Sequence, residues 1–336
     1  MIPAVSVLMP VRDVADTVDA AARSILAGDH TDLELLIVDD GSTDDTPARL
    51  AELAAADGRV RVLSQGPAGI VTALNRGLEA ARAPWLARMD GDDLSEPRRL
   101  STQLRFLAEQ PGIGVCDSRV EIFRDDGPTG GGYQSYQRWL DGIESHRDFE
   151  REMLIENPVV HPAVVASTAL LRGVGGYRDG PFPEDYDIWL RCARAGARFH
   201  KLPERLLRWR DHGRRLTRTD RRYSRSAFVP LKWEHLAATR LRPGLRVAVW
   251  GAGPAARPWL RALRQSDCEL TAVFDIDPAK IGNPRQGVTV RPVEEVGEAA
   301  FDLLLVAVGA RGARALIRER LAQTALEEPS DCLFVA

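Results

Sequence analysis

The chain of 336 residues has few lysines, no paired cysteines and no long apolar run. Only three of its 45 basic residues are lysines, and its four cysteines are scattered without a CxxC pair. We therefore expect buried, reduced cysteines and not a metal site or a disulfide framework. No run approaches the roughly 20 apolar residues that span a bilayer, and the N-terminus lacks the features of a secretory leader. These absences predict a cytoplasmic protein.

The charge balance and the length narrow the class further. A net charge of −3 argues against a general nucleic-acid binder. A hydrophobic content of 44% over 336 residues is enough for sizeable cores and suggests two domains.

Strand and helix signals alternate through the first half of the chain. Apolar runs of strand length are followed by segments of helical spacing, which predicts an α/β domain with a mostly parallel sheet covered on both faces. The expected strands are 5–9, 33–38, 60–63 and 85–89, and the expected helices are 16–26, 46–56, 71–83 and 97–110. Beyond residue 112 the pattern is looser: it predicts a loop at 127–132, a polar helical stretch at 138–157, a strand at 163–171 and a helix at 185–195.

A second α/β pattern begins after a break at 241–244. We assign a first domain to residues 1–240 and a small Rossmann-like domain to 244–336, and we expect each to fold by itself. Strands are predicted at 245–250, 270–274 and 301–308. Gly251 and Gly253 in a Gly-x-Gly-x-x-Ala turn, with Asp275 further on, match the dinucleotide fingerprint and would favour NAD over NADP. No Tyr or His follows residue 244, so a binding or homodimerisation module is favoured over a redox centre.

Three acidic clusters carry the functional signal. They are VDDGSTD at 38–44, MDGDD at 89–93 and PEDYDIW at 183–189. The first two follow predicted strands, and carboxylates at the carboxyl ends of parallel strands face the crevice where open α/β sheets bind ligands. Each cluster alone has an ordinary alternative as a solvated turn. Together, in this order, they indicate a metal-dependent enzyme that acts on a sugar nucleotide.

The first 240 residues resemble the family 2 glycosyltransferases, inverting enzymes of the GT-A fold. The resemblance is carried by VSVLMPVR at 5–12, VDDGSTD at 38–44, LNRGL at 74–78, RMDGDD at 88–93 and EDYDIWLR at 184–191. It implies transfer of a sugar from a nucleoside-diphosphate sugar, with a UDP-sugar favoured, to a glycan or lipid-linked acceptor. It also implies the following donor-nucleotide residues: Pro10, Val11, Asp39, Asp40, Asn75 and Asp90.

The same resemblance implies a metal site and a base. Asp92 would ligate Mn²⁺ or Mg²⁺, hard cations that prefer oxygen ligands, and Asp93 would support the site or cap the following turn. Asp185 would remove the proton of the acceptor hydroxyl, with Glu184 orienting it or contacting the acceptor. The alternative is that both residues only cap the helix that begins there, where the dipole favours anions. Trp189 and Cys192 share a face with Asp185 and are expected in the core.

Two histidines and an arginine-rich stretch complete the candidates. His161, in a His-Pro pair, would line the acceptor side, and His212 would be a third metal or diphosphate contact; a loop histidine is the alternative for the second. Nine arginines lie between residues 205 and 225. They form a solvated face, or Arg210, Arg214 or Arg215 reaches the diphosphate, or the stretch contacts an anionic membrane surface.

Two rival functions are weighed against glycosyl transfer. A sugar nucleotidyltransferase would carry a Gly-rich loop with Arg and Lys after the first strand, and residues 9–13 contain no Gly or Lys. A non-catalytic sugar-nucleotide sensor would need no base, which argues against it because both carboxylate sets are present. The sequence does not identify the donor base, the sugar or the acceptor.

Overall fold

The computed structural model describes residues 2–128 and 130–336, which form two compact units. The first unit comprises Met1–Phe149 and Pro158–Ala227, and the second comprises Glu150–Asn157 and Phe228–Ala336. The chain therefore passes between the units three times, and the division differs from the single break predicted at 241–244. In the part of the chain that the structure describes, no helix combines the length and the hydropathy needed to cross a membrane.

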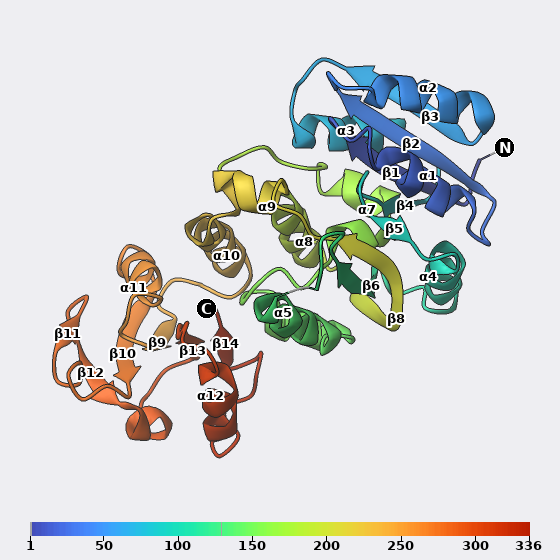
Figure 1. The fold of residues 1–336 in the computed structure, drawn as a ribbon. Coiled ribbons are helices and arrows are strands. Elements are labelled where there is room, and N and C mark those ends of the chain that lie inside the picture. Colours follow the sequence, from blue (N-terminus) through green and yellow to red (C-terminus); the bar gives the residue numbers. More distant parts are fainter. Residues whose placement is uncertain (1, 129) are drawn as a thin grey trace. The chain divides into compact units, whose positions relative to one another are not determined.

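The predicted parallel strands form one half of the first sheet (Figure 1). They are β1 (Val5–Val11), β2 (Leu33–Asp40), β3 (Val60–Gln65) and β4 (Trp85–Arg88). The whole sheet has the order β3-β2-β1-β4-β7-β6-β8-β5, and the pairs β1/β2, β2/β3 and β1/β4 are parallel. Every residue of β1 and β2 is buried, as expected for strands that are covered on both faces. The connecting helices are α1 (Val18–Leu26), α2 (Thr46–Ala56) and α3 (Ile70–Ala80).

Packing of α3 on this sheet explains one glycine of the LNRGL motif. A Cβ atom on Gly77 would lie 2.0 Å from Cδ1 of Leu8 on β1. Any side chain at this position would push the helix away from the sheet, because interiors are close-packed.

The other half of the first sheet is where the sequence predictions were weakest. The strands are β5 (Leu94–Ser95), β6 (Val115–Phe123), β7 (Val165–Ser167) and β8 (Phe199–Arg210). The long strands β6 and β8 were not predicted, because polar and charged residues interrupt both; they pair in parallel with shifts in register. The strand predicted at 163–171 was too long, since Ser167 caps a helix there by accepting a hydrogen bond from the Leu170 N–H at 3.3 Å.

Short helices connect these strands. They are α4 (Arg99–Glu109), α5 (Gly131–Asp141), α6 (His146–Glu152), η1 (His161–Ala163), α7 (Thr168–Gly173), α8 (Glu184–Arg194), α9 (Leu216–Thr219) and η2 (Arg221–Tyr223). The helix α5 begins inside the loop predicted at 127–132. As predicted, Trp189 and Cys192 of α8 are buried.

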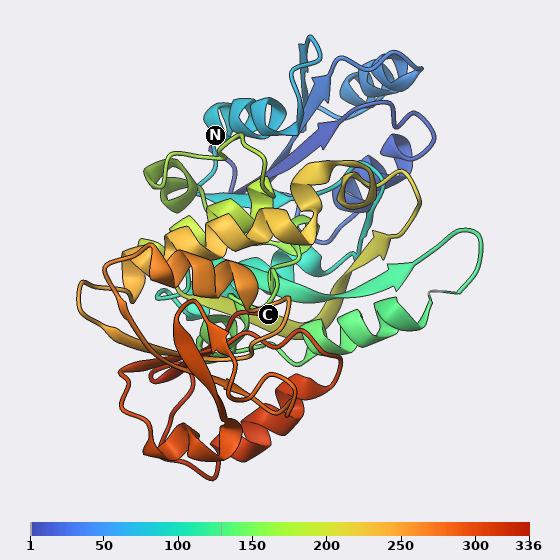
Figure 2. The same cartoon turned by 90° about the vertical axis from the view of Figure 1, so that its left-hand side faces the viewer.

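The second unit is an α/β unit built on a smaller, mostly parallel sheet, as expected for the second half of the chain. Its strands are β9 (Arg246–Trp250), β10 (Glu269–Asp275), β11 (Pro284–Arg285), β12 (Val288–Pro292), β13 (Leu303–Val306) and β14 (Cys332–Phe334), in the order β11-β12-β10-β9-β13-β14. All neighbours are parallel except β11 and β12. Figures 1 and 2 show α11 (Arg257–Arg264) and α12 (Ala313–Leu321) on opposite sides of this sheet. The remaining elements are α10 (Arg225–Thr239), which begins just before the unit boundary, and η3 (Val293–Glu298).

Residues Glu150–Asn157 are part of the second unit although they lie far away in the sequence. Ile155 packs in the core of this unit, and Glu152 forms an ion pair of 2.8 Å with Arg318. The buried ammonium of Lys232 donates hydrogen bonds to the carbonyl oxygens of Ile155 (2.8 Å) and Val335 (3.3 Å). The second unit is therefore assembled from two separate stretches of chain.

Candidate active site

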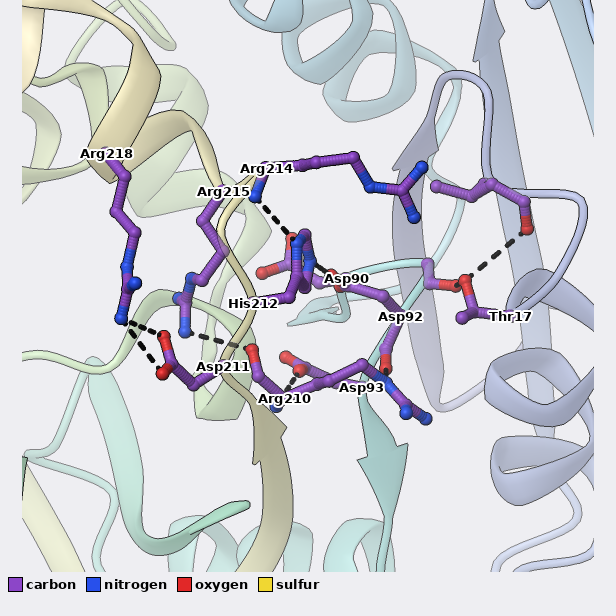
Figure 3. A network of polar contacts seen from close by, with 12 residues as sticks. Thr17, Asp90, Asp92, Asp93, Arg210, Asp211, His212, Arg214, Arg215 and Arg218 are labelled. Atoms are coloured by element: carbon purple, nitrogen blue, oxygen red, sulfur yellow. Dashed lines mark hydrogen bonds and ion pairs between the residues drawn. The ribbon is translucent and has the colours of Figure 1, made fainter. Parts of the chain in front are cut away.

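Three carboxylates gather where β4 ends. Oxygens of Asp90, Asp92 and Asp93 all lie within 4.8 Å of one another. The guanidinium of Arg88, buried in β4, pairs with Asp90 at 2.6 Å, and Nε2 of His212 lies 2.7 Å from Oδ2 of Asp92 (Figure 3). The structure thus brings the two predicted metal residues together, although 120 positions separate them in the sequence.

Asp93 is the most buried member of this acidic cluster, with 1% of its surface exposed. Its Oδ1 accepts a hydrogen bond from the Arg210 N–H at 2.8 Å, whereas its buried Oδ2 has no partner among the described residues. Burial, followed by the charges of Asp90 and Asp92, raises the pKa of Asp93 well above its ordinary value. Neither oxygen accepts a hydrogen bond from the residues that directly follow Asp93, so the predicted cap of the following turn is not formed and the role of support to the site stays a prediction.

The acidic cluster has the chemistry of a site for a hard divalent cation. Burial and the neighbouring Asp90 raise the pKa of Asp92 as well. The cationic side chains around the cluster therefore do not balance the negative charge of its carboxylates. Carboxylate oxygens are the ligands that Mg²⁺ and Mn²⁺ prefer, and the unpartnered Oδ2 of Asp93 is an orphaned acceptor in a buried position. The residues present therefore fit a metal ion.

The predicted nucleotide residues lie at the same edge of the sheet. Pro10 and Val11 are in register with Val38 and Asp39, at the carboxyl ends of β1 and β2. The Asp39 carboxylate accepts hydrogen bonds from the N–H (3.0 Å) and hydroxyl (2.6 Å) of Ser42.

Asp40 is bound to the next loop along the sheet edge. Its carboxylate accepts hydrogen bonds from the N–H groups of Ala68 and Gly69, both at 2.9 Å. Between the two loops, Gly41 adopts a φ of +73°, and a Cβ there would lie 2.7 Å from the Pro67 nitrogen. The two aspartates therefore shape the loops at the edge where a nucleotide would bind.

Asn75 and His161 are joined through one tyrosine. The Asn75 side chain accepts a hydrogen bond from the Tyr177 N–H and donates one to its carbonyl, both at 2.8 Å. The Tyr177 hydroxyl then lies 2.9 Å from Nε2 of His161. Burial, and then the charge of Arg88, lowers the pKa of His161 well below its ordinary value, so the ring is neutral. In this arrangement Asn75 positions Tyr177, and His161 is a buried neutral acceptor or donor beside it.

The third acidic cluster divides between the start of α8 and its interior. Glu184 is 4% exposed, and the Tyr223 hydroxyl lies 2.8 and 2.7 Å from its two oxygens. Burial raises the pKa of Glu184. Asp185 is half-buried, and Oδ1 of its side chain accepts a hydrogen bond from the Tyr186 N–H at 2.7 Å. Asp187 points elsewhere and forms an ion pair with Arg191 at 2.7 Å.

The arginine-rich stretch, residues 205–225, is anchored by a buried carboxylate. Asp211 accepts hydrogen bonds from Arg124 at 3.0 Å and from Arg218 at 2.7 and 2.9 Å. Arg215 stacks on the ring of Trp209 at 4.2 Å. Most arginines of this stretch therefore contact carboxylates or rings of the protein, and they do not form a purely solvated face.

The arginines predicted to reach the diphosphate differ in their contacts and exposure. Arg210 is occupied: its guanidinium pairs with Asp125 and donates to the Asp92 carbonyl at 2.6 Å. Arg214 is exposed, and its N–H donates to Nδ1 of His212 at 3.2 Å. Figure 3 shows the side chain of Arg214 extending toward the side of Thr17, whereas the side chain of Arg215 points toward Arg210, whose carbonyl accepts a hydrogen bond from it at 3.1 Å.

The glycine turn of the second unit is stabilised from within. The Asp275 carboxylate accepts hydrogen bonds from the N–H groups of Ala252 (2.7 Å) and Asp277 (2.9 Å), and Lys280 lies 3.3 Å from it. A Cβ on Gly251 would lie 2.6 Å from the Ala307 carbonyl oxygen, whereas Gly253 has open space apart from Lys280. Asp275 thus holds the turn, and a ribose would have to compete with these donors.

Comparison with known proteins agrees with this geometry. Residues 6–174 match the family Glycosyl transferase family 2, and residues 244–325 match the CoA binding domain. An uncharacterized glycosyltransferase of Haemophilus influenzae is 29% identical over 216 residues, which cover 63% of this chain and 66% of that protein, just under two thirds. The O-antigen biosynthesis glycosyltransferase WbnJ of Escherichia coli is 26% identical, over 68% of this chain and 87% of its own.

A solved structure is similar in fold. The crystal structure of residues 1–349 of S. aureus TarS, in complex with UDP-GlcNAc, aligns with a TM-score of 0.54 at 15% identity. The alignment covers 71% of this chain and 68% of that one.

Proposed function

Because the chain belongs to glycosyltransferase family 2, we propose that it is a metal-dependent, inverting glycosyltransferase that moves a sugar from a nucleoside-diphosphate sugar to an acceptor hydroxyl. The observation that carries the proposal is the acidic cluster at the end of β4, facing His212. A cluster of this kind serves no packing purpose, since it leaves a buried oxygen of Asp93 without a partner.

The leaving group explains the need for a cation. A nucleoside diphosphate gains negative charge as the glycosidic bond breaks, and a bound Mn²⁺ or Mg²⁺ would neutralise it. Asp92 and His212, with Asp93 in support, are the residues that would hold the ion. Asp90 is fixed by Arg88 and, with Asp39, Asp40, Pro10 and Val11, forms the proposed nucleotide side.

Inversion needs one base on the acceptor side. Asp185 is the proposed base, because a carboxylate at a helix start is held in place and remains half-exposed for an incoming hydroxyl. The buried Glu184 orients it. Arg214 is the arginine proposed to meet a diphosphate, since it is exposed and its backbone N–H bonds His212. His161, buried beside Tyr177, would act through its neighbours more than by contact.

The donor and acceptor classes rest on relatives. TarS, of similar fold, was crystallised with UDP-GlcNAc, which supports a UDP-sugar donor here. The name of WbnJ refers to O-antigen biosynthesis, which supports a glycan or lipid-linked acceptor in polysaccharide synthesis. The rival functions, nucleotidyl transfer and sensing, gain no support from these relatives.

For the second unit we propose a ligand-binding role without redox chemistry. The match to the CoA binding domain and the open backbone at Gly253 support a ligand with phosphate groups. The Asp275 carboxylate is already bonded to the N–H groups of Ala252 and Asp277, which makes selection of a ribose, and therefore of NAD, by this residue less favourable.

Donor binding tests the central proposal. Calorimetry with UDP-, GDP- and dTDP-sugars, with and without Mn²⁺, should reveal one donor whose affinity depends on the metal. Asp92→Ala should abolish the metal-dependent part of that affinity and leave the circular dichroism spectrum unchanged. The exposed Asp126→Asn is a matched control. Equal affinity with and without Mn²⁺ in both Asp92→Ala and the parent protein would disprove metal dependence.

A further inference from the structure

Tyr223 lies near the end of the arginine-rich stretch and contacts the carboxylate next to the proposed base. Its hydroxyl is 2.8 and 2.7 Å from the two oxygens of Glu184. Among the residues that the structure describes, no other side chain donates a hydrogen bond to Glu184 and no cationic nitrogen lies within ion-pair distance of it. A buried carboxylate that receives one side-chain donor, beside its own backbone N–H, depends strongly on that donor.

The same stretch reaches the acidic cluster at its other end. His212 contacts Asp92, and eleven positions later Tyr223 contacts Glu184. Between them, Arg218 is fixed by Asp211 and by the Tyr133 hydroxyl, which lies 2.5 Å from its Nη2. Residues 211–223 therefore link the proposed metal ligands to the helix that bears the base, and we call them the brace.

The electrostatics around Glu184 identify what the hydroxyl does. Burial raises the pKa of Glu184, and the hydrogen bond from Tyr223 is the largest influence that lowers it again; Arg222 and Arg88 act in the same direction from further away. Burial and the charges of Glu184 and Asp185 raise the pKa of Tyr223 far above its ordinary value. The phenol therefore remains a donor at every relevant pH.

We infer that Tyr223 is a positioning residue for catalysis, which holds Glu184 at the start of α8 and so fixes Asp185 relative to the brace that carries His212. The inference rests on the proposed function. Among the residues that the structure describes, Tyr223 forms hydrogen bonds with Glu184 and with neither Asp92 nor His212, so it acts through Glu184.

Two tyrosine variants separate positioning from anchoring of the brace. Tyr223→Phe removes the donor to Glu184, and the matched control Tyr133→Phe removes a hydroxyl that anchors the brace elsewhere. With the UDP-sugar and Mn²⁺, release of UDP by Tyr223→Phe should show kcat lowered about tenfold with little change in KM. The acid limb of its pH profile should change, because Glu184 loses the donor that lowers its pKa and its charge lies next to the base Asp185. Tyr133→Phe should keep the parent profile.

Hydrogen exchange gives a readout that does not need activity. In the metal-free protein, Tyr223→Phe should speed exchange at the start of α8, where Tyr133→Phe should not. A parent enzyme that releases no UDP with any donor would contradict the proposed function and leave the exchange result to decide this inference. Equal pH profiles and equal exchange in both variants would overturn the inference while transfer itself stands.

Discussion

Replacing Asp93 by Asn should stabilise the metal-free protein at neutral pH. Asp93 is buried beside Asp90 and Asp92, and its pKa is raised well above the ordinary 3.8. In the unfolded chain the carboxyl ionises near that ordinary value, whereas in the folded protein it keeps its proton to higher pH. The folded state then binds more protons, so stability falls as pH rises from about 4 through the raised pKa.

The magnitude follows from this proton. Each pH unit over which Asp93 stays protonated in the folded state costs about 1.4 kcal/mol of stability. Asparagine has the shape of the protonated acid and can still accept the Arg210 N–H at Oδ1. Its amide can donate towards the neighbouring carboxylates in place of the unpartnered Oδ2. We expect Asp93→Asn to gain on the order of 1–3 kcal/mol at pH 7.

Urea unfolding between pH 5 and pH 8 in the presence of a chelator would measure the effect. The parent should lose stability with rising pH more steeply than Asp93→Asn, and added Mn²⁺ should stabilise the parent more than the variant, since the ion binds the folded state. Asp126→Asn is the control, because the pKa of the exposed Asp126 is lowered by Arg124. An Asp93→Asn protein that is less stable than the parent at pH 7, with the same pH slope, would refute this reasoning.

Two further predictions concern the base and the second unit. Asp185→Asn should bind donor normally and lose at least about a hundredfold in transfer, because the amide cannot take the acceptor proton; near-normal transfer would leave Asp185 as a helix cap only. A chain cut after residue 240 should be poorly soluble or melt at lower temperature, because Glu152 loses its ion pair with Arg318 and Ile155 loses the core residues that it packs against. A soluble piece that melts like the full chain would show that Glu150–Asn157 needs no second unit.

The sequence predicted the continuous apolar strands β1 and β2 and missed the long strands β6 and β8, whose apolar residues are interrupted by polar ones. The strands β1 and β2 are continuous apolar runs because helices cover both sides of the sheet. In β8, Glu204 and Arg205 are exposed and interrupt the apolar run, while the backbone still pairs with β6. Hydrophobic periodicity cannot detect a strand of this kind, because its pairing depends on a distant partner.

The candidate site shows the same division between local and distant information. Asp90, Asp92, Glu184 and Asp185 are recognisable because each follows a strand or starts a helix in a short motif. Tyr223 lies in no motif, and its contact with Glu184 spans 39 positions. Arg88 could have been noticed, since a charged residue at the end of an apolar strand, two positions before Asp90, needs a partner.

The path of the chain ties the site to the second unit by covalent connection. Residues 150–157 belong to the second unit. At Pro158, three positions before His161, the chain returns to the first unit. In the first unit this return is fixed by a buried ion pair of 3.1 Å between Lys201 and Asp117: Lys201 donates a hydrogen bond to the Pro158 carbonyl, and Asp117 accepts one from the Val160 N–H. Removing one partner of a buried ion pair is strongly destabilising, because the other charge is left buried without compensation. Since this pair also bonds the backbone on either side of Val159, the position of His161 is set from within the first unit.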